Sequence, residues 1–186
     1  MQGNISLANG HNKFINGDAP QKRKEVLMAE AILTEKDMDA IINALANGCT
    51  FAEVSGMKKE EVEGLYSLAY NFYNSGNFKD ADTMFRALCT YDYKDSRFWM
   101  GLAGCRQANG ELKQAIDAYS MAGMADLLAN PEPFFYAAKC YIKLGEKENA
   151  IDALKCVLGI GDADDPKNAA TYQKAKSLLE LLNKGE

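Results

Sequence analysis

The chain has 186 residues, of which 47% are hydrophobic and 25% are charged, and its formal net charge is −5. This composition is typical of a soluble globular protein with one sizeable core. The acidic balance argues against a nucleic-acid partner, because a surface that follows phosphates needs clustered basic side chains, and the only basic cluster is Lys22-Arg23-Lys24.

Residues 1–34 form a predicted, largely flexible N-terminal segment. Glycine and asparagine are frequent up to about residue 22 and no apolar period is sustained there, and residues 23–33 have the pattern of an amphipathic turn or two. The apolar stretch at residues 26–33 is interrupted by Glu30. We therefore expect neither an export signal nor a membrane span, and no stable membrane association.

A helix is predicted over residues 35–47, with Thr34 as its N-cap and Asn47-Gly48 at its C-terminus. Such a short helix needs a partner, which is either the rest of the chain or a second copy. With a short turn capped by Thr50 and ended by Gly56, it fills a predicted connecting region, residues 35–61. Its apolar face, at i, i+3, i+4 and i+7, supplies the candidate dimerisation residues Met38, Ile41, Ile42 and Leu45.

Two sets of small residues then recur with separations of 34 and 35 residues: Gly76, Gly110 and Gly145, and Ala81, Ala115 and Ala150. This is the period of the tetratricopeptide repeat, in which glycine ends the first helix and small residues let two helices cross closely. The template places repeats at residues 62–95, 96–129 and 131–164. We predict an all-α fold of three tandem tetratricopeptide (helix-turn-helix) repeats that form a curved solenoid.

Large apolar residues fill other template positions: Leu65, Trp99 and Phe134 in the first helices, and Phe85, Tyr119 and Leu154 in the second. The template's closing proline is replaced by Tyr93, Leu127 and Asp162. Pro166 begins a last predicted helix, to about Asn183, within the region 165–186. This capping helix is expected to cover the open end of the core with Leu178, Leu179, Leu181 and Leu182.

The residues that usually carry chemistry form no recognisable catalytic or metal site. His11 is the only histidine and lies in a polar segment, and the acids Asp80, Asp82, Asp164 and Asp165 are typical of a solvated surface. The five cysteines lack C-x-x-C spacing and indicate buried thiols in a reducing compartment: Cys49, Cys89, Cys105, Cys140 and Cys156. We therefore expect no enzyme activity, no metal and no cofactor.

The first helix of each repeat lines the concave side of such a solenoid, so its outward positions are candidates for binding. Tyr66, Tyr70 and Tyr73 share one helical face, and a row of phenols suits a surface that is wet when free and covered when bound. The alternative is that these rings pack against a preceding helix. The candidate peptide-binding residues are Tyr66, Tyr70, Tyr73, Asn74, Arg97, Met100, Gly101, Gly104, Gln107 and Phe135, with Glu63, Glu132, Lys139 and Ile142 at further concave positions.

Two of these candidates have two interpretations. Gly101 and Gly104 leave room either for the backbone of a ligand or for a neighbouring helix. Met100 beside them offers an adaptable apolar wall. An extended peptide with spaced apolar or proline side chains fits a channel of this kind, because tyrosine combines a large contact area with a hydroxyl for backbone hydrogen bonds.

Three stretches of the chain resemble the class II chaperones of bacterial type III secretion systems. They are Leu65-Tyr66-x-x-Ala69-Tyr70-x-Phe72-Tyr73-Asn74-x-Gly76, Phe85-Arg86-x-Leu88-Cys89-x-Tyr91-Asp92 and Met100-Gly101-Leu102-Ala103. The preceding Gly48-x-Thr50-Phe51 and Gly56-Met57 are similar as well, so the likeness covers residues from about 35 to 183. The longer N-terminal segment, and Gly104 where many relatives carry alanine, depart from the family.

The resemblance implies a cytoplasmic bacterial chaperone that keeps hydrophobic translocator proteins soluble until export. It implies that a Pro-x-Leu-x-x-Pro-like segment of the translocator lies extended in the concave groove, on Tyr66, Tyr70 and Tyr73. It also implies a homodimer formed through the helix at residues 35–47. A general tetratricopeptide scaffold that captures another protein's C-terminal carboxylate is the alternative, but it needs a cationic clamp where this chain carries tyrosines, Gly104 and Phe135.

Overall fold

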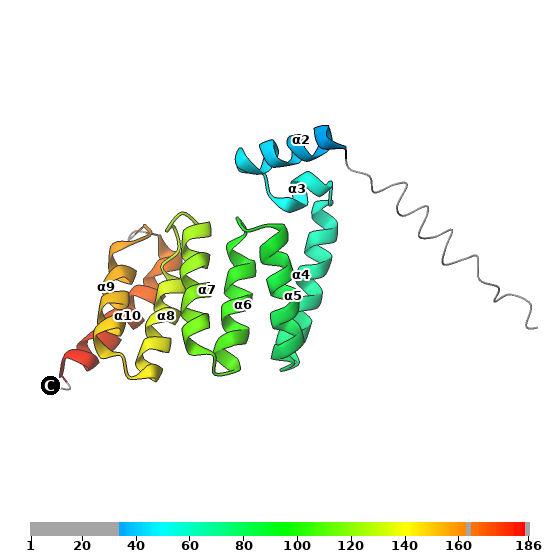
Figure 1. Cartoon of the computed structure of the whole chain (residues 1–186). Coiled ribbons are helices and arrows are strands. Elements are labelled where there is room, and N and C mark those ends of the chain that lie inside the picture. Colours follow the sequence, from blue (N-terminus) through cyan, green and yellow to red (C-terminus); the bar gives the residue numbers. More distant parts are fainter. Residues whose placement is uncertain (1–33, 163–164, 185–186) are drawn as a thin grey trace, which may run out of the picture. The chain divides into compact units, whose positions relative to one another are not determined.

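The computed structural model describes residues 34–162 and 165–184, in which the helices are joined by turns and short connections and no strand occurs. The predicted all-α class is therefore confirmed (Figure 1). The helices in the described ranges are α2 (Glu35–Ala46), α3 (Phe51–Ser55), α4 (Lys59–Asn74), α5 (Phe78–Tyr91), α6 (Ser96–Ala108), α7 (Leu112–Ala125), α8 (Glu132–Leu144), α9 (Lys147–Gly159) and α10 (Pro166–Lys184).

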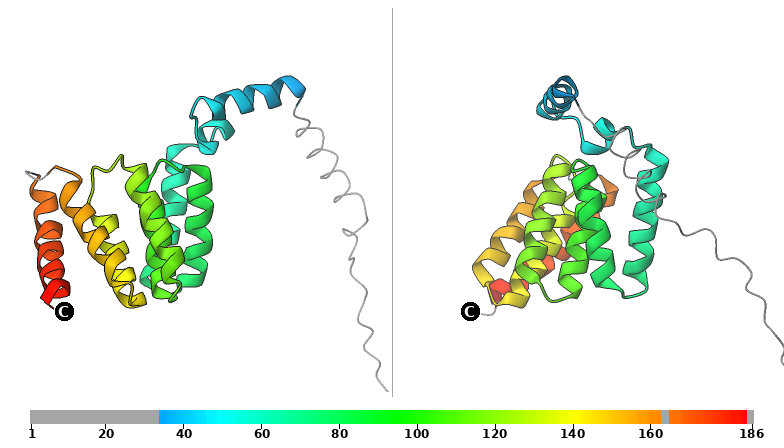
Figure 2. Two further views of the ribbon diagram at one scale, coloured as in Figure 1. Left: turned by 60° about the vertical axis from the view of Figure 1, so that its left-hand side comes forward. Right: turned by 45° about the vertical axis from the view of Figure 1, so that its right-hand side comes forward.

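Helices α4 to α9 form the three predicted helix pairs, α4 with α5, α6 with α7 and α8 with α9. Each helix packs against the next one along the chain, so the pairs stack side by side (Figures 1 and 2). The first helices of the first two pairs also touch, since α4 contacts α6. This arrangement places α4, α6 and α8, which carry the candidate binding residues, in the same position of each repeat.

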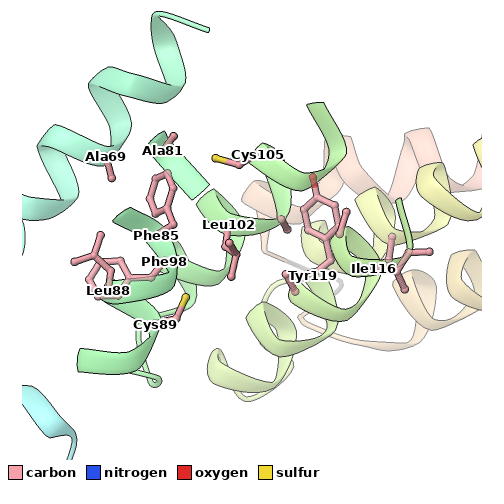
Figure 3. Packing of buried hydrophobic residues seen from close by; sticks show 14 of the residues in the cluster. Ala69, Ala81, Phe85, Leu88, Cys89, Phe98, Leu102, Cys105, Ile116 and Tyr119 are labelled. Atoms are coloured by element: carbon pink, nitrogen blue, oxygen red, sulfur yellow. The ribbon is translucent and has the colours of Figure 1, made fainter. Parts of the chain in front are cut away.

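The predicted small and large core positions are buried as the repeat requires. The alanines at the helix crossings, Ala69, Ala103 and Ala138 with Ala81, Ala115 and Ala150, have no exposed surface. A bare methyl group lets the two helix axes approach, and larger side chains then fill the space beside it. Phe85 and Leu102 lie in this layer together with Ala69 and Ala81 (Figure 3).

The turns between paired helices depend on residues with positive φ. Gly76, Gly110 and Gly145 have φ angles of 79°, 82° and 76°, which confirms their predicted role in the turns. Leu127 and Leu128, between α7 and α8, have φ angles of 52° and 61° although they are not glycines. Proline is restricted to φ near −65°, so this conformation explains why the template's closing proline is absent at residue 127.

Helix α10 covers the end of the third repeat, as the sequence predicts. Ala138, Leu154 and Val157 have no exposed surface and form a second core cluster with Ala175 of α10. The partly buried leucines of α10 that pack on this cluster are Leu178, Leu179 and Leu182. The prediction is wrong for Leu181, which is 66% exposed because the helix turns it away from the cluster.

Helix α2 contains the boundary between two structural units, which falls after Asn43. Thr34 caps it as predicted, since the backbone N–H of Asp37 donates to the Thr34 hydroxyl at 3.2 Å and the Asp37 carboxylate accepts from the Thr34 backbone at 3.0 Å. The Thr34 hydroxyl also donates to the Asp37 carboxylate at 2.6 Å, and this bond, followed by the one from the Thr34 backbone, lowers the pKa of Asp37. Apart from Thr34, the segment predicted to be flexible, residues 1–34, lies outside the described residues.

No residue of α2 is buried, and three of its four candidate dimerisation residues are well exposed: Met38 at 45%, Ile42 at 56% and Leu45 at 40%.

The capped turn that follows is also as predicted, with Thr50 at its start and Gly56 at its end. Among the described helices, none combines the length and the apolar character that crossing a bilayer would take.

Candidate peptide-binding site

The candidate site is centred on Tyr66, Tyr70 and Tyr73 of α4, which we call the tyrosine row. Tyr70 is 49% exposed, whereas Tyr66 and Tyr73 are half-buried and pack against the first core cluster. The rings of Tyr66 and Tyr70 stack with their centroids 6.1 Å apart. The row is therefore neither sealed in the core nor fully solvated, which suits a surface that a partner covers.

Tyr66 is held in place by its neighbours on α5 and α6. Its ring meets Phe85 edge-on at 6.1 Å and lies 5.7 Å from Phe98, measured between centroids. The guanidinium of Arg97 lies 4.8 Å from the ring centroid of Tyr66, within cation–π range. The ring thus contacts both core aromatics and a cation, so little entropy is lost when a ligand covers it.

Arg97 is itself tied by two carboxylates, Glu63 of α4 and Asp95 before α6, each with an oxygen 2.6 Å from the guanidinium. The hydrogen bonds from Arg97 lower the pKa of Glu63, and both carboxylates raise the pKa of Arg97. Because all three groups are partly exposed, water screens the network and its contribution to stability is small. Its main effect is to hold Arg97 over Tyr66.

Tyr73 fills the contact between α4 and α6 at the other end of the row. Its ring lies 5.4 Å from the Phe78 ring in an edge-on arrangement. A methyl group at Gly104 would stand 3.2 Å from the Tyr73 ring and hydroxyl. Gly104 therefore lets α6 approach Tyr73, which is the packing role rather than the ligand-room role that the sequence left open.

Within the described residues, the hydroxyls of Tyr66, Tyr70 and Tyr73 have no hydrogen-bond partner, and no buried side-chain polar atom there is left unsatisfied. The hydroxyls therefore face solvent. Burial of the rings raises the pKa of Tyr66 and of Tyr73, so both phenols stay protonated at neutral pH. Three spaced O–H donors on half-covered rings can bond the carbonyl groups of an extended peptide.

Gly101 also has the packing role of the two that the sequence left open. A Cβ atom there would collide with the ring of Phe85, which is only 1% exposed. The space predicted for a ligand backbone is thus filled by the protein's own core. Met100 beside it is half-buried against the same cluster, and Asn74 is exposed at the C-terminal end of α4.

Gln107 connects three helices instead of facing a ligand with its carbonyl group. Its Oε1 accepts a hydrogen bond from the Tyr119 hydroxyl of α7 at 3.0 Å and one from the Cys140 thiol of α8 at 3.4 Å. Burial raises the pKa of both Tyr119 and Cys140, so both groups remain donors at neutral pH. Gln107 therefore positions the second repeat against the third.

Tyr136 of α8 is a residue of this region that the sequence analysis missed. It is half-buried on the first core cluster and stacks on Tyr119 with centroids 5.5 Å apart. Burial is the main cause that raises its pKa, followed by Glu132, with a smaller contribution from Tyr73. The extra residue in the spacing between the second and third repeats was the available signal, because it makes the register of α8 uncertain by one position.

Phe135, predicted for the same groove, lies on a different surface. It packs partly buried on the second core cluster and lines a cavity between α8 and α10. The structure thus brings together Tyr66, Tyr70, Tyr73, Arg97 and Gly104 and leaves Phe135 outside the group. In the described residues no group of three metal-ligating side chains occurs.

Comparisons with known proteins place the fold and the family. Two family models described as tetratricopeptide repeat match residues 62–95 and 134–155. The Low calcium response locus protein H of Yersinia pseudotuberculosis (serotype I, strain IP32953) is 35% identical over 156 residues, which are 84% of this chain and 92% of that protein.

Two solved complexes are also similar to this chain. One is the type III secretion chaperone SycD of Yersinia enterocolitica with a peptide of the translocator YopD, which is 37% identical with a TM-score of 0.64 and covers 70% of this chain and 98% of that one. The other is PcrH, known from Pseudomonas aeruginosa, with the chaperone binding region of PopD; it is 33% identical with a TM-score of 0.64 and covers 69% and 95%.

Proposed function

The chain belongs to the translocator chaperones of type III secretion, and from this premise we propose that its tyrosine row holds an extended segment of a hydrophobic translocator. Chaperones of this family are binding proteins, which confirms the expectation that the chain is not an enzyme. The mechanism is masking: a client whose apolar segment is covered has a lower free concentration and self-associates or inserts into a membrane less.

One observation carries the proposal: three half-covered phenol rings stand in a row with hydroxyls that bond nothing in the described part of the chain. Apolar and proline side chains of a Pro-x-Leu-x-x-Pro-like segment gain contact area on such rings, and the segment's carbonyl groups gain donors. Complexes of SycD with a YopD peptide and of PcrH with a PopD region support the same choice of partner.

Tyr70 gives the sharpest test, because it is 49% exposed and is not part of the core clusters. Replacing Tyr70→Ala should leave the helical content unchanged and weaken binding of a translocator peptide containing Pro-x-Leu-x-x-Pro by about tenfold or more. Binding is measured by fluorescence anisotropy, and helical content by circular dichroism.

Tyr93→Ala is the matched control, since Tyr93 is similarly exposed, at 45%, and lies outside the row. The control should bind the peptide as the unaltered chain does. Equal affinity of the Tyr70→Ala variant and the control would contradict the proposal.

An arginine clamp for a C-terminal carboxylate is disfavoured, because Arg97 is already engaged by Glu63 and Asp95.

The proposal includes a homodimer in the bacterial cytoplasm, where a client has to be held before export. The apolar face of α2 supports it, since Met38, Ile42 and Leu45 are large and exposed. Ile42→Glu should reduce the mass measured by sedimentation from that of a dimer to that of a monomer, while Lys36→Glu, elsewhere on α2, should not. A dimer that persists in Ile42→Glu would remove α2 from the interface.

A further inference from the structure

A second apolar surface lies between α8 and α10, away from the tyrosine row. It is a cavity of about 510 Å³, within the range of about 300–1,000 Å³ that ligand sites commonly occupy. Its floor is made of Phe135 and Ile142 of α8 and Leu178 and Leu181 of α10. Leu181 is 66% exposed, so its apolar side chain does not pack in the core and is accessible at this site.

Three lysines surround this floor: Lys139 and Lys143 of α8 and Lys174 of α10. Within the described ranges, none of their ammonium groups has a carboxylate at ion-pair distance. Lysine stems commonly cover apolar surface while the ammonium groups stay in water. These lysines therefore place three unpaired positive charges around the cavity, although the formal net charge of the chain is −5.

The cavity is separate from the tyrosine row, but Phe135 in its lining is followed by Tyr136, which packs on the same core cluster as the row. Phe135, Lys139 and Ile142 of α8 line the cavity on one side, and α10, which lines it on the other, contacts α8. The Lys139 ammonium lies 5.9 Å from the Phe135 ring and 5.1 Å from the ring of Tyr136, which packs on the same core cluster as the row. Lys139 therefore lies beside one aromatic ring of each core cluster.

We propose that the cavity between α8 and α10 binds a second segment of the client, apolar at its centre and flanked by acidic residues. This inference rests on the proposed function, because the segment belongs to the protein whose other part lies on the tyrosine row. Apolar side chains fill the floor, and carboxylates on either side meet the lysines, which favours this segment over a basic one. Two linked sites raise the affinity for one chain beyond that of either site.

The test uses two synthetic peptides with the same leucine-rich centre, one flanked by glutamates and one by lysines, titrated into the full chain. The glutamate-flanked peptide should bind, and the double variant Lys143→Glu with Lys174→Glu should weaken its binding about tenfold, with the effect declining as salt rises. Leu181→Ser should weaken it as well. Lys113→Glu, an exposed lysine of α7 outside the cavity, should not.

The tyrosine row is titrated in parallel with the Pro-x-Leu-x-x-Pro peptide, so that the two proposals fail separately. Tyr70→Ala should weaken only that peptide, and the double lysine variant only the glutamate-flanked one. Equal binding of the glutamate-flanked and lysine-flanked peptides, or an affinity that the double variant leaves unchanged, would overturn the inference while leaving the tyrosine row intact. A change in sedimenting mass on Leu181→Ser, with neither peptide bound at the cavity, would assign it to a second copy and overturn the inference too.

Discussion

At Gly101 the missing side chain matters because the Phe85 ring occupies the space where a Cβ atom would stand. Phe85 is 1% exposed and is surrounded by the residues of the first core cluster. Overpacking of this kind costs about 1–3 kcal/mol, whereas alanine gains up to about 1 kcal/mol over glycine within a helix. We expect Gly101→Ala to lower the free energy of unfolding by about 1–2 kcal/mol, measured by urea denaturation followed by circular dichroism.

Gly64 of α4 is the matched control, since a Cβ atom there would meet nothing within 4 Å and its φ is not positive. Gly64→Ala should raise the free energy of unfolding by about 0.5–1 kcal/mol through helix propensity alone. If both variants were stabilised alike, the packing role of Gly101 would be refuted, and room for a ligand would again be its better explanation.

The five thiols should differ sharply in reactivity. Burial raises the pKa of Cys89 and of Cys105 to about 12 and also raises that of Cys140, so at pH 8 these groups hold almost no thiolate. Cys156 is exposed. We expect iodoacetamide at pH 8 to label Cys156 rapidly and the three buried thiols only after denaturation, as read by mass spectrometry of tryptic peptides.

The sign of the pH dependence follows from the same shifts. The folded chain keeps the protons of Cys89 and Cys105 up to pH about 12, whereas the unfolded chain loses them from its ordinary pKa of 9.0. The stability that these thiols contribute is thus fully present below pH 9 and is lost as the pH rises towards 12. Rapid labelling of Cys89 in the folded chain would contradict its burial.

Between α7 and α8, the connection stores backbone strain in two leucines with φ angles of 52° and 61°. A left-handed conformation costs a residue with a Cβ atom about 1–2 kcal/mol, and glycine avoids this cost at some expense in unfolded-state entropy. Leu127 is 89% exposed, so little packing is lost when it is replaced. Leu127→Gly should therefore raise the free energy of unfolding by about 0.5–1 kcal/mol in urea denaturation.

Leu127→Pro at the same position tests the conformation itself. Proline cannot adopt the positive φ. It also has no N–H, so the hydrogen bond that the Leu127 N–H donates to the Met124 carbonyl at 3.0 Å would be lost. This variant should be destabilised by more than about 1 kcal/mol. A proline variant as stable as the unaltered chain would show that the connection is not held in the left-handed region.

How far the sequence predicts an element depends on whether local chemistry or packing determines it. The Gly76, Gly110 and Gly145 turns and the Thr34 and Thr50 caps follow from short-range rules, and all of them were predictable. The strained leucines were not, because contacts such as the bond from the Gly161 N–H to the Leu128 carbonyl at 3.1 Å bring together residues far apart in the sequence.

The binding face was predictable only in part for a similar reason. Helical periodicity correctly placed Tyr66, Tyr70 and Tyr73 on one face of α4. The absence of a side chain at Gly101 could not say which neighbour fills the space, and only the packed structure identifies Phe85. The register of α8, one residue off the strict period, decided that Tyr136 lies with the first core cluster and Phe135 with the second.

At the scale of the whole molecule, a stack of repeats buries its core only if each end is covered. The last repeat leaves Ala138, Leu154 and Val157 facing α10, and all three are fully buried there. Deleting residues 165–186 would expose them and remove the contacts of Leu178, Leu179 and Leu182, at about 1.5–3 kcal/mol for each large apolar side chain that returns to water.

We expect the chain that ends at residue 164 to melt at a lower temperature by circular dichroism, to bind the dye ANS, and to aggregate on heating. Leu181→Ser in the full chain is the control, because Leu181 is 66% exposed and contributes nothing to the second cluster, so its melting temperature should not change. A shortened chain that melts like the full one, without dye binding, would mean that the third repeat closes the core by itself. In that case α10 would not be needed to cover the core and would only line the client cavity. The complete burial of Ala175 would then have no role in stability.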